Sequence, residues 1–94
     1  MLKFNAENIE DLEQEARDRA HEVSVEVITS VIKGLDAGVD RIVIGILTSL
    51  DMDLTVDKAG YLEALETNLA RCEEAEEYEL CKKAIYWIKK LKNN

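Results

Sequence analysis

The sequence predicts an all-α fold, a small four-helix bundle whose last two helices form a C-terminal antiparallel hairpin. The 94 residues include no proline and only four glycines, so little in the chain interrupts a helix. Apolar residues recur at intervals of three and four in several segments, which is the spacing of one helix face. A chain of this length forms one domain, so residues 1–94 are expected to fold as a single α-helical unit.

The first helix is expected to begin near Asn5 or Asn8, because a side-chain oxygen there can accept hydrogen bonds from unpaired backbone amides. Acidic residues crowd the following turns, where the positive end of the helix dipole favours them. The helix is expected to reach Leu35, and Gly34 or Gly38 with Asp36 is expected to supply the turn that ends it. Its apolar stripe consists of Ile9, Leu12, Ala16, Ala20, Val23, Val27 and Val31.

A second helix is expected over residues 39–50, because their apolar residues fall at the positions of a packed helix face. Two segments carry a strand signal as well: β-branched residues alternate in 23–27, and 41–47 is a short apolar run. Helix is preferred for both, since the neighbouring segments are helical and an isolated two-stranded sheet has little stability. The apolar face of the second helix would comprise Val39, Ile42, Val43, Ile46, Leu47 and Leu50.

The last two helices are expected within residues 61–91. Residues 51–57 are interpreted as a connector, and Thr55 or Asp57 as the cap of the third helix. Tyr78 and Leu69 are expected to hold the hairpin closed, because each lies at the bend end of an apolar stripe. The two stripes are Leu62, Leu65, Leu69 and Cys72, then Tyr78, Cys81, Ile85, Ile88 and Leu91.

The chain is acidic, with a net charge of −8. Direct binding to nucleic acid is not expected, because that requires clustered Lys and Arg. The hairpin itself divides its charge: seven acids and one arginine lie in 61–80, whereas five lysines and no acid follow Cys81. Acidity serves solubility in the simplest interpretation, and binding to a basic protein surface or imitation of DNA are the alternatives.

The sequence predicts neither a membrane-spanning segment nor a secretory signal. Residues 1–4 lead into a polar run instead of an apolar signal segment. The longest strongly apolar stretch, Ile42 to Leu50, is far shorter than the ~20 residues of a membrane span. Two cysteines without a signal peptide indicate a reducing compartment, so a cytoplasmic location with free thiols is expected.

Two candidate polar sites do not satisfy their chemistry. Asp51, Asp53, Thr55 and Asp57 occupy alternate positions like calcium ligands, but Val56 stands where a calcium loop needs glycine and Leu62 where it needs glutamate. The only histidine, His21, has no evident nucleophile or orienting group, which acid–base or triad catalysis requires. The sequence therefore predicts a protein without catalytic residues, metal ligands or cofactors.

The cysteines and glycines also fit structural roles better. Cys72 and Cys81 are nine residues apart, which matches no zinc-ligand spacing, and they are interpreted as small apolar residues at a close helix contact. If the hairpin brings them together, they form an oxidation-sensitive pair. Gly34 and Gly38 lack the following lysine of a phosphate-binding loop.

Two surfaces are candidates for binding. Tyr86 and Trp87 lie beside lysines and provide an anchor for a partner, because aromatic residues dominate interface energetics; packing against the first helix is the alternative. The second helix has excess apolar surface, so self-association as a dimer is expected. Candidate partner-binding residues are Tyr78, Glu79, Lys83, Tyr86, Trp87 and Lys90, and candidate self-association residues are Ile42, Ile44, Ile46 and Leu47.

The hairpin residues also follow the order of a known motif: Leu65-Glu66, Leu69, Cys72, Tyr78-Glu79, Cys81, Ile88 and Leu91. This order resembles the UVR motif, a helical hairpin of excision-repair subunits B and C and of some protease adaptors. The chain departs from the motif at Glu76, at Lys82 and at Ile85-Tyr86, which replaces the usual Arg-Asp pair. The resemblance implies a hairpin that docks on another copy or on a partner's hairpin, without nuclease or helicase activity.

The functional prediction is a non-enzymatic protein–protein interaction module. It would suit a phage or mobile-element regulator or inhibitor that acts on a host protein. One alternative is an acidic DNA mimic that occupies a DNA-binding protein, which needs the acids of 7–26 and 63–79 on one continuous surface. Another alternative is an oligomeric helical sponge that traps a small ligand between protomers.

Overall fold

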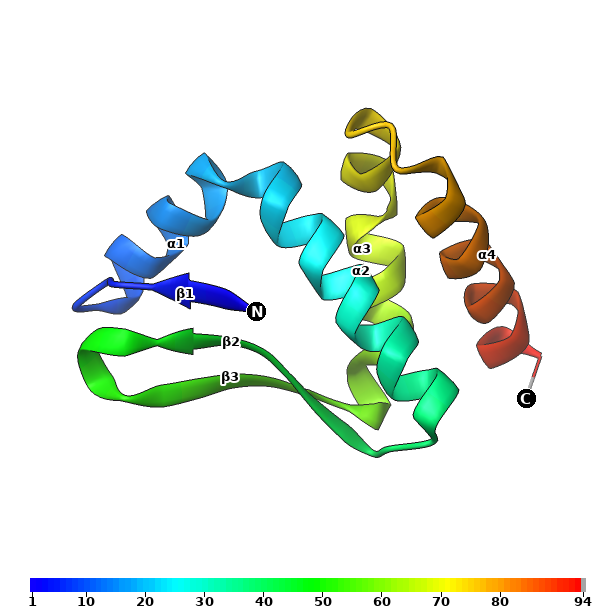
Figure 1. Ribbon diagram of the computed structural model, residues 1–94, viewed down its shortest axis with the longest axis horizontal. Coiled ribbons are helices and arrows are strands. Elements are labelled where there is room, and N and C mark those ends of the chain that lie inside the picture. The colour runs from blue at the N-terminus through cyan, green and yellow to red at the C-terminus, as the bar shows by residue number, and fades with distance from the viewer. Residues whose placement is uncertain (94) are drawn as a thin grey trace.

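Residues 1–93, the part of the chain that the computed structural model describes, form four α-helices and a three-stranded sheet (Figure 1). Short 3₁₀ turns at Thr48–Leu50 and Lys58–Gly60 flank the third strand. The sheet and α1 lie at one end of the molecule and α4 at the other. In chain order the elements are β1 (Leu2–Phe4), α1 (Ile9–Asp18), α2 (Ala20–Ala37), β2 (Arg41–Leu47), β3 (Met52–Asp57), α3 (Tyr61–Glu74) and α4 (Tyr78–Lys92).

The sheet has the order β1-β2-β3, with β2 in the centre. β1 runs parallel to β2 and places Leu2 opposite Gly45 and Phe4 opposite Leu47. β3 returns antiparallel to β2, from Met52 opposite Leu47 to Asp57 opposite Arg41. The fold is therefore α+β, and the prediction of an all-α four-helix bundle is wrong.

The error lies in residues 39–57. A strand at 41–47 is disfavoured in the sequence because two strands alone have little stability. The structure has three strands: Leu2–Phe4 pairs with β2, and residues 51–57, the expected connector, contain β3. The apolar pattern of 41–47 imitates a helix because a bulge between Val43 and Gly45 shifts the strand alternation. Ile42 and Ile44 consequently pack against the helices, while Leu47 joins a second core.

The first predicted helix is interrupted at Arg19, which separates α1 from α2. Asn8 caps α1 as expected, since its Oδ1 accepts a hydrogen bond from the Asp11 amide at 2.9 Å. Residues 23–27 are helical despite their strand signal. α2 ends at Gly38, whose φ of 71° is in the left-handed region that glycine adopts without strain.

Two clusters of buried residues hold the elements together. The larger lies among α2, α3 and α4, where Ile28, Val31, Tyr61 and Leu65 are fully buried. The smaller joins Leu2, Phe4, Ala6 and Leu47 beneath α1 and α2. Among the helices of residues 1–93, none has both the length and the apolar character that a membrane crossing requires.

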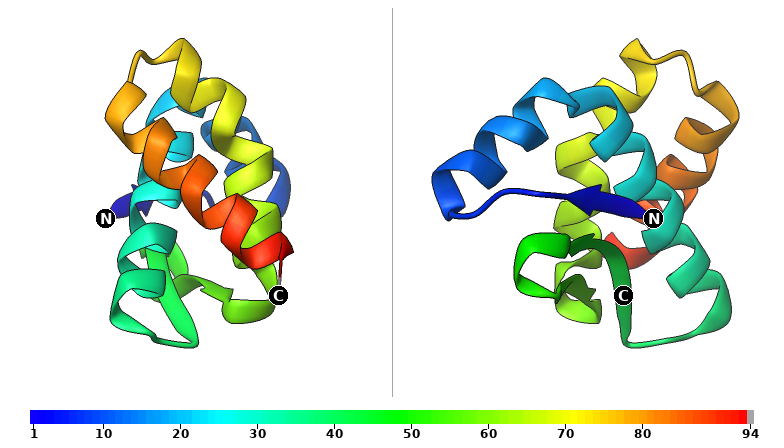
Figure 2. Two further views of the ribbon diagram at one scale, coloured as in Figure 1. Left: turned by 90° about the vertical axis from the view of Figure 1, so that its right-hand side faces the viewer. Right: turned by 60° about the vertical axis from the view of Figure 1, so that its left-hand side comes forward.

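α3 and α4 lie side by side in opposite directions, and α2 packs against both (Figure 2). The bend between them is tight: Glu76 has a positive φ of 61°, and the Glu77 amide donates to the Cys72 carbonyl at 3.2 Å. Tyr78 is 60% exposed just after the bend, so the expectation that it holds the hairpin closed is wrong. Cys72, Cys81 and Ala84 fill the contact between the helices instead.

Candidate functional site

α4 has one buried face and one broad exposed face. Cys81 and Ala84 are buried and Ile88 and Leu91 partly buried, so the packed stripe recurs every three or four residues. Acidic Glu79 stands in the first turn and lysines in the last, which stabilises the helix through its dipole. The opposite side, called the α4 outer face below, comprises Tyr78, Glu79, Lys82, Lys83, Ile85, Tyr86, Lys89 and Lys90.

An aromatic and cationic cluster occupies the middle of this helix. The Tyr86 and Trp87 rings meet edge to face, with centroids 5.4 Å apart and an interplanar angle of 84°. Lys90 Nζ lies 5.6 Å from the Tyr86 centroid and 5.1 Å from that of Trp87, which is within the range of cation–π attraction. Trp87 packs partly against the main core and fixes the cluster, while Tyr86 remains 56% exposed.

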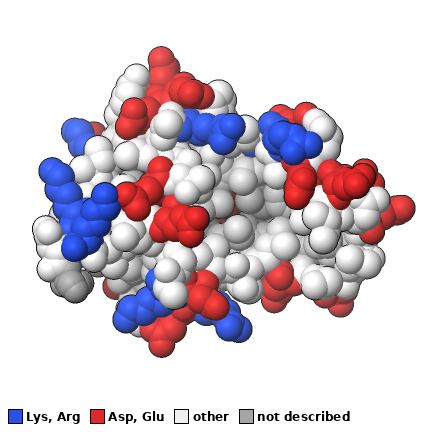
Figure 3. Space-filling model, turned by 180° about the vertical axis from the view of Figure 1, so that it is seen from behind, with Lys and Arg blue, Asp and Glu red and all other residues white. Residues whose placement is uncertain are grey.

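The α4 outer face combines exposed apolar surface with positive charge. Tyr78 and Ile85, two helical turns apart, are both exposed, Ile85 by 39%. Lys82 lies 3.3 Å from Glu79, whereas Lys83 and Lys89 form no ion pair with any residue of 1–93. On the face drawn in Figure 3, Lys and Arg side chains lie at the α4 end of the molecule, at the left, and also along the top and at the bottom among acidic side chains.

All six predicted partner-binding residues therefore lie on α4, and five of them share the outer face. Trp87 is the exception, because it lies at the border with the core. The alternative that Tyr86 and Trp87 pack together against the first helix does not hold for Tyr86, which is exposed. Five of the six predicted partner-binding residues are thus exposed on one helix.

The predicted self-association residues do not share an exposed face. These residues were expected on the second helix, but residues 41–47 form the central strand β2. Leu47 is only 7% exposed and belongs to the second core, while Ile42 and Ile44 pack against the main core. Ile46 lies opposite Lys3 on one side and Asp53 on the other, within a mixed polar surface.

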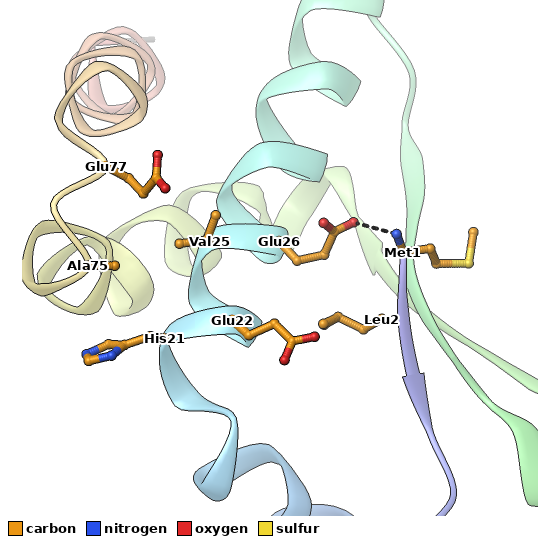
Figure 4. Close-up of a pocket in the computed structure, with 8 residues that line it drawn as sticks. All are labelled: Met1, Leu2, His21, Glu22, Val25, Glu26, Ala75 and Glu77. Atoms are coloured by element: carbon orange, nitrogen blue, oxygen red, sulfur yellow. Dashed lines mark ion pairs between the residues drawn. The ribbon is translucent and has the colours of Figure 1, made fainter.

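A cavity of about 460 Å³ lies between α2, β1 and the α3–α4 bend (Figure 4). Two of its three carboxylates have partners: Glu26 is 3.4 Å from the Met1 amino group, and Glu22 accepts two hydrogen bonds from Arg19. The Arg19 hydrogen bonds lower the pKa of Glu22. His21 is 2.9 Å from Glu74, and the residues that line the cavity include no hydroxyl or thiol nucleophile.

The two cysteines lie together inside the hairpin, and both thiols are buried and free. Burial, with a hydrogen bond from the Cys72 thiol to the neighbouring Cys81, raises the pKa of Cys72 to about 12. A thiol with so high a pKa stays protonated at neutral pH and reacts slowly. This agrees with the interpretation of both residues as small apolar groups at a close helix contact.

Sequence reasoning missed a further cavity, between α1, α2 and α3, whose lining includes both Arg17 and Arg71. No pattern in the sequence links residues of three helices that lie so far apart in the chain.

In residues 1–93 no group of three His, Cys, Asp or Glu side chains has the geometry to hold a metal ion. In comparisons with known proteins, no family model, curated protein sequence or solved structure matches the chain.

Proposed function

We propose that this protein is a non-enzymatic interaction module that binds an acidic surface of a partner protein through the α4 outer face. The observation that carries the proposal is the exposure of Tyr86 in an ordered cluster with Trp87 and Lys90. Aromatic side chains that are exposed and held in place are the residues that most often dominate binding energy. Trp87 anchors the cluster in the core, so little side-chain entropy is lost on binding.

Charge complementarity defines the partner. α4 carries five lysines and one glutamate in a chain whose net charge is −8. The lysines steer an acidic surface toward α4, whereas the acidic remainder of the molecule repels that surface elsewhere. A partner would therefore dock in one orientation, with apolar contact at Tyr78, Ile85 and Tyr86 and ion pairs at the rim.

The resemblance of residues 61–91 to the UVR motif supports the same type of role, because it implies a hairpin that docks on another protein. The DNA-mimic alternative receives less support. It needs one continuous acidic surface, and Lys and Arg side chains interrupt the acids on the face in Figure 3. A ligand sponge between protomers also receives less support, because its expected seam in residues 42–47 is a strand that is partly buried.

Affinity capture with matched variants tests the proposal. The wild-type protein is immobilised beside Tyr86→Ala, Lys90→Glu and a control, Lys58→Glu, and bound proteins from its source cells are quantified by mass spectrometry. Lys58 is an exposed lysine in the 3₁₀ turn before α3, outside the α4 outer face. We expect one acidic protein to be retained by wild type and by Lys58→Glu and depleted by both α4 variants.

The interaction is then measured with the purified partner by calorimetry. Tyr86→Ala is expected to weaken binding by about tenfold or more, as loss of an interface anchor does. Lys90→Glu should weaken it most at low salt, because exposed charges are screened as ionic strength rises. Equal capture by all four proteins, or depletion by the control alone, would refute the α4 outer face as the docking surface.

A further inference from the structure

An open cavity of about 190 Å³ lies between three helices near the α1–α2 junction, and Arg17 and Arg71 are exposed at its surface. α1 and α2 supply small apolar walls, Ala16, Ala20 and Val23, which leave space between the helices. The polar lining consists of Arg17 from α1, Ser24 from α2, and Asn68 and Arg71 from α3. Unlike the cavity of Figure 4, this lining includes no carboxylate.

The two arginines of this cavity differ from the other two in the chain. Arg19 pairs with Glu15 and Glu22, and Arg41 pairs with Asp57 at 2.6 Å. Arg17 and Arg71 form no ion pair with any residue of 1–93, although the chain has 20 acidic residues. Two arginines without carboxylate partners therefore line one cavity.

The local contacts leave the donors of both arginines available. Arg17 makes one side-chain hydrogen bond, from Nη2 to Gln14 Oε1 at 3.1 Å. Glu74, one turn after Arg71, lies 2.9 Å from His21 instead of pairing with the arginine. A guanidinium group has five N–H donors in a planar fork, so most donors on both side chains remain for a ligand.

The inner wall of the cavity is polar and ordered. Ser24 is only 2% exposed, and its hydroxyl donates to Asn68 Oδ1 at 2.9 Å. Asn68 Nδ2 in turn donates to the Ala64 carbonyl at 2.7 Å. These bonds fix the orientation of the Asn68 amide, whose second N–H is not used by any described residue. The wall thus adds a positioned neutral donor to the two cations.

We propose that this cavity binds a small oxyanion, a phosphate or carboxylate group held by Arg17 and Arg71 with Asn68 as a further donor. Paired guanidinium forks match the geometry of such oxygens and form charge-assisted hydrogen bonds with them. Because these donors come from α1 and α3, the ligand links α1 to the helical core. This site is separate from the α4 outer face and does not depend on the function proposed for it.

Titration of the whole protein by NMR tests the site, with inorganic phosphate and acetate as probes at constant ionic strength. Arg17→Gln and Arg71→Gln remove one cation each from different helices, and Arg41→Gln is the control because Arg41 pairs with Asp57 on the sheet. We expect saturable shifts at Ser24, Asn68 and Arg71 with at least one probe. Each cavity variant should weaken that binding by about tenfold or more, whereas the control keeps the wild-type affinity.

The two probes separate the possible ligands. Saturation by phosphate alone identifies a phosphate-bearing ligand, and saturation by acetate identifies a carboxylate. Amide spectra of each variant verify that the fold is intact. Linear shifts spread over the lysines with both probes, or equal affinity for wild type and both cavity variants, would overturn the proposal.

Discussion

The Arg19 guanidinium carbon lies 4.9 Å from the centre of the Phe4 ring and thereby links the α1–α2 junction to β1. The same guanidinium group donates to the Lys3 carbonyl at 2.7 Å and pairs with Glu15 and Glu22 on the two helices. One side chain thus joins three elements at the point where the predicted first helix is interrupted. It holds α1 and α2 against strand β1.

Arg19→Ala should therefore destabilise the protein by roughly 1–2 kcal/mol, because it removes charge-assisted hydrogen bonds and a cation–π contact together. Arg41→Ala is the matched control, since its pair with Asp57 is largely exposed and should contribute less than about 0.5 kcal/mol. Urea denaturation of both variants measures the difference. Equal losses would mean that the Arg19 contacts do not hold the junction.

Gly34 allows α2 to approach β2 and α3 closely. A Cβ at this position would lie 2.5 Å from Ile42 Cγ2 and 3.1 Å from the Tyr61 hydroxyl, which donates to the Val39 carbonyl. Gly34→Ala is expected to destabilise the protein by about 1–3 kcal/mol through overpacking, despite the better helix propensity of alanine. At Gly60 a Cβ would meet its nearest atom at 3.5 Å, so Gly60→Ala should be close to neutral in the same denaturation experiment.

The hairpin is closed by residues inside it and not by Tyr78. Leu65 is fully buried, so Leu65→Ala should cost about 2–5 kcal/mol in the free energy of unfolding. Tyr78→Ala should cost less than about 0.5 kcal/mol, because the ring is largely in solvent. A large loss for Tyr78→Ala in thermal or chemical unfolding would place that ring in a contact absent from this fold.

The raised pKa of Cys72 predicts a loss of stability at alkaline pH. Burial keeps the folded thiol neutral up to about pH 12, whereas the unfolded thiol ionises near its ordinary value of 9.0. The contribution of the neutral Cys72 thiol to the free energy of unfolding is therefore complete below pH 9.0 and decreases as pH rises from there toward 12. Unfolding free energies from about pH 8 to about pH 10 should fall more steeply for wild type than for Cys72→Ala. Parallel pH profiles for the two proteins would show that ionisation of the Cys72 thiol does not cause the loss of stability.

Sequence reasoning worked where local physics decides the structure. The Asn8 cap, the glycine end of α2 and the helical periodicity of 61–91 depend on residues close together in the chain. It failed for the sheet, because β1 and β2 are separated by two helices and their pairing is visible only in three dimensions. The three residues Leu2–Phe4 are too few to give a strand pattern of their own.

The candidate surface on α4 was accessible to sequence reasoning because helix periodicity determines which residues share a face. Three of the five predicted stripe residues, Cys81, Ile88 and Leu91, do pack against the core, but Ala84 is buried while Ile85 and Tyr78 are exposed. Small Ala84 permits close approach of α3, and that preference for small residues outweighs hydrophobicity at this contact. The cavity with Arg17 and Arg71 depends on tertiary structure alone.

Site-specific photo-crosslinking tests the central claim, that the α4 outer face docks an acidic protein. A benzoylphenylalanine is placed at position 86 in one protein and at position 55, on the exposed side of β3, in another. After irradiation in source cells, position 86 should yield one dominant adduct with an acidic protein, and position 55 should not. Dominant adducts from position 55 with none from position 86 would contradict the account.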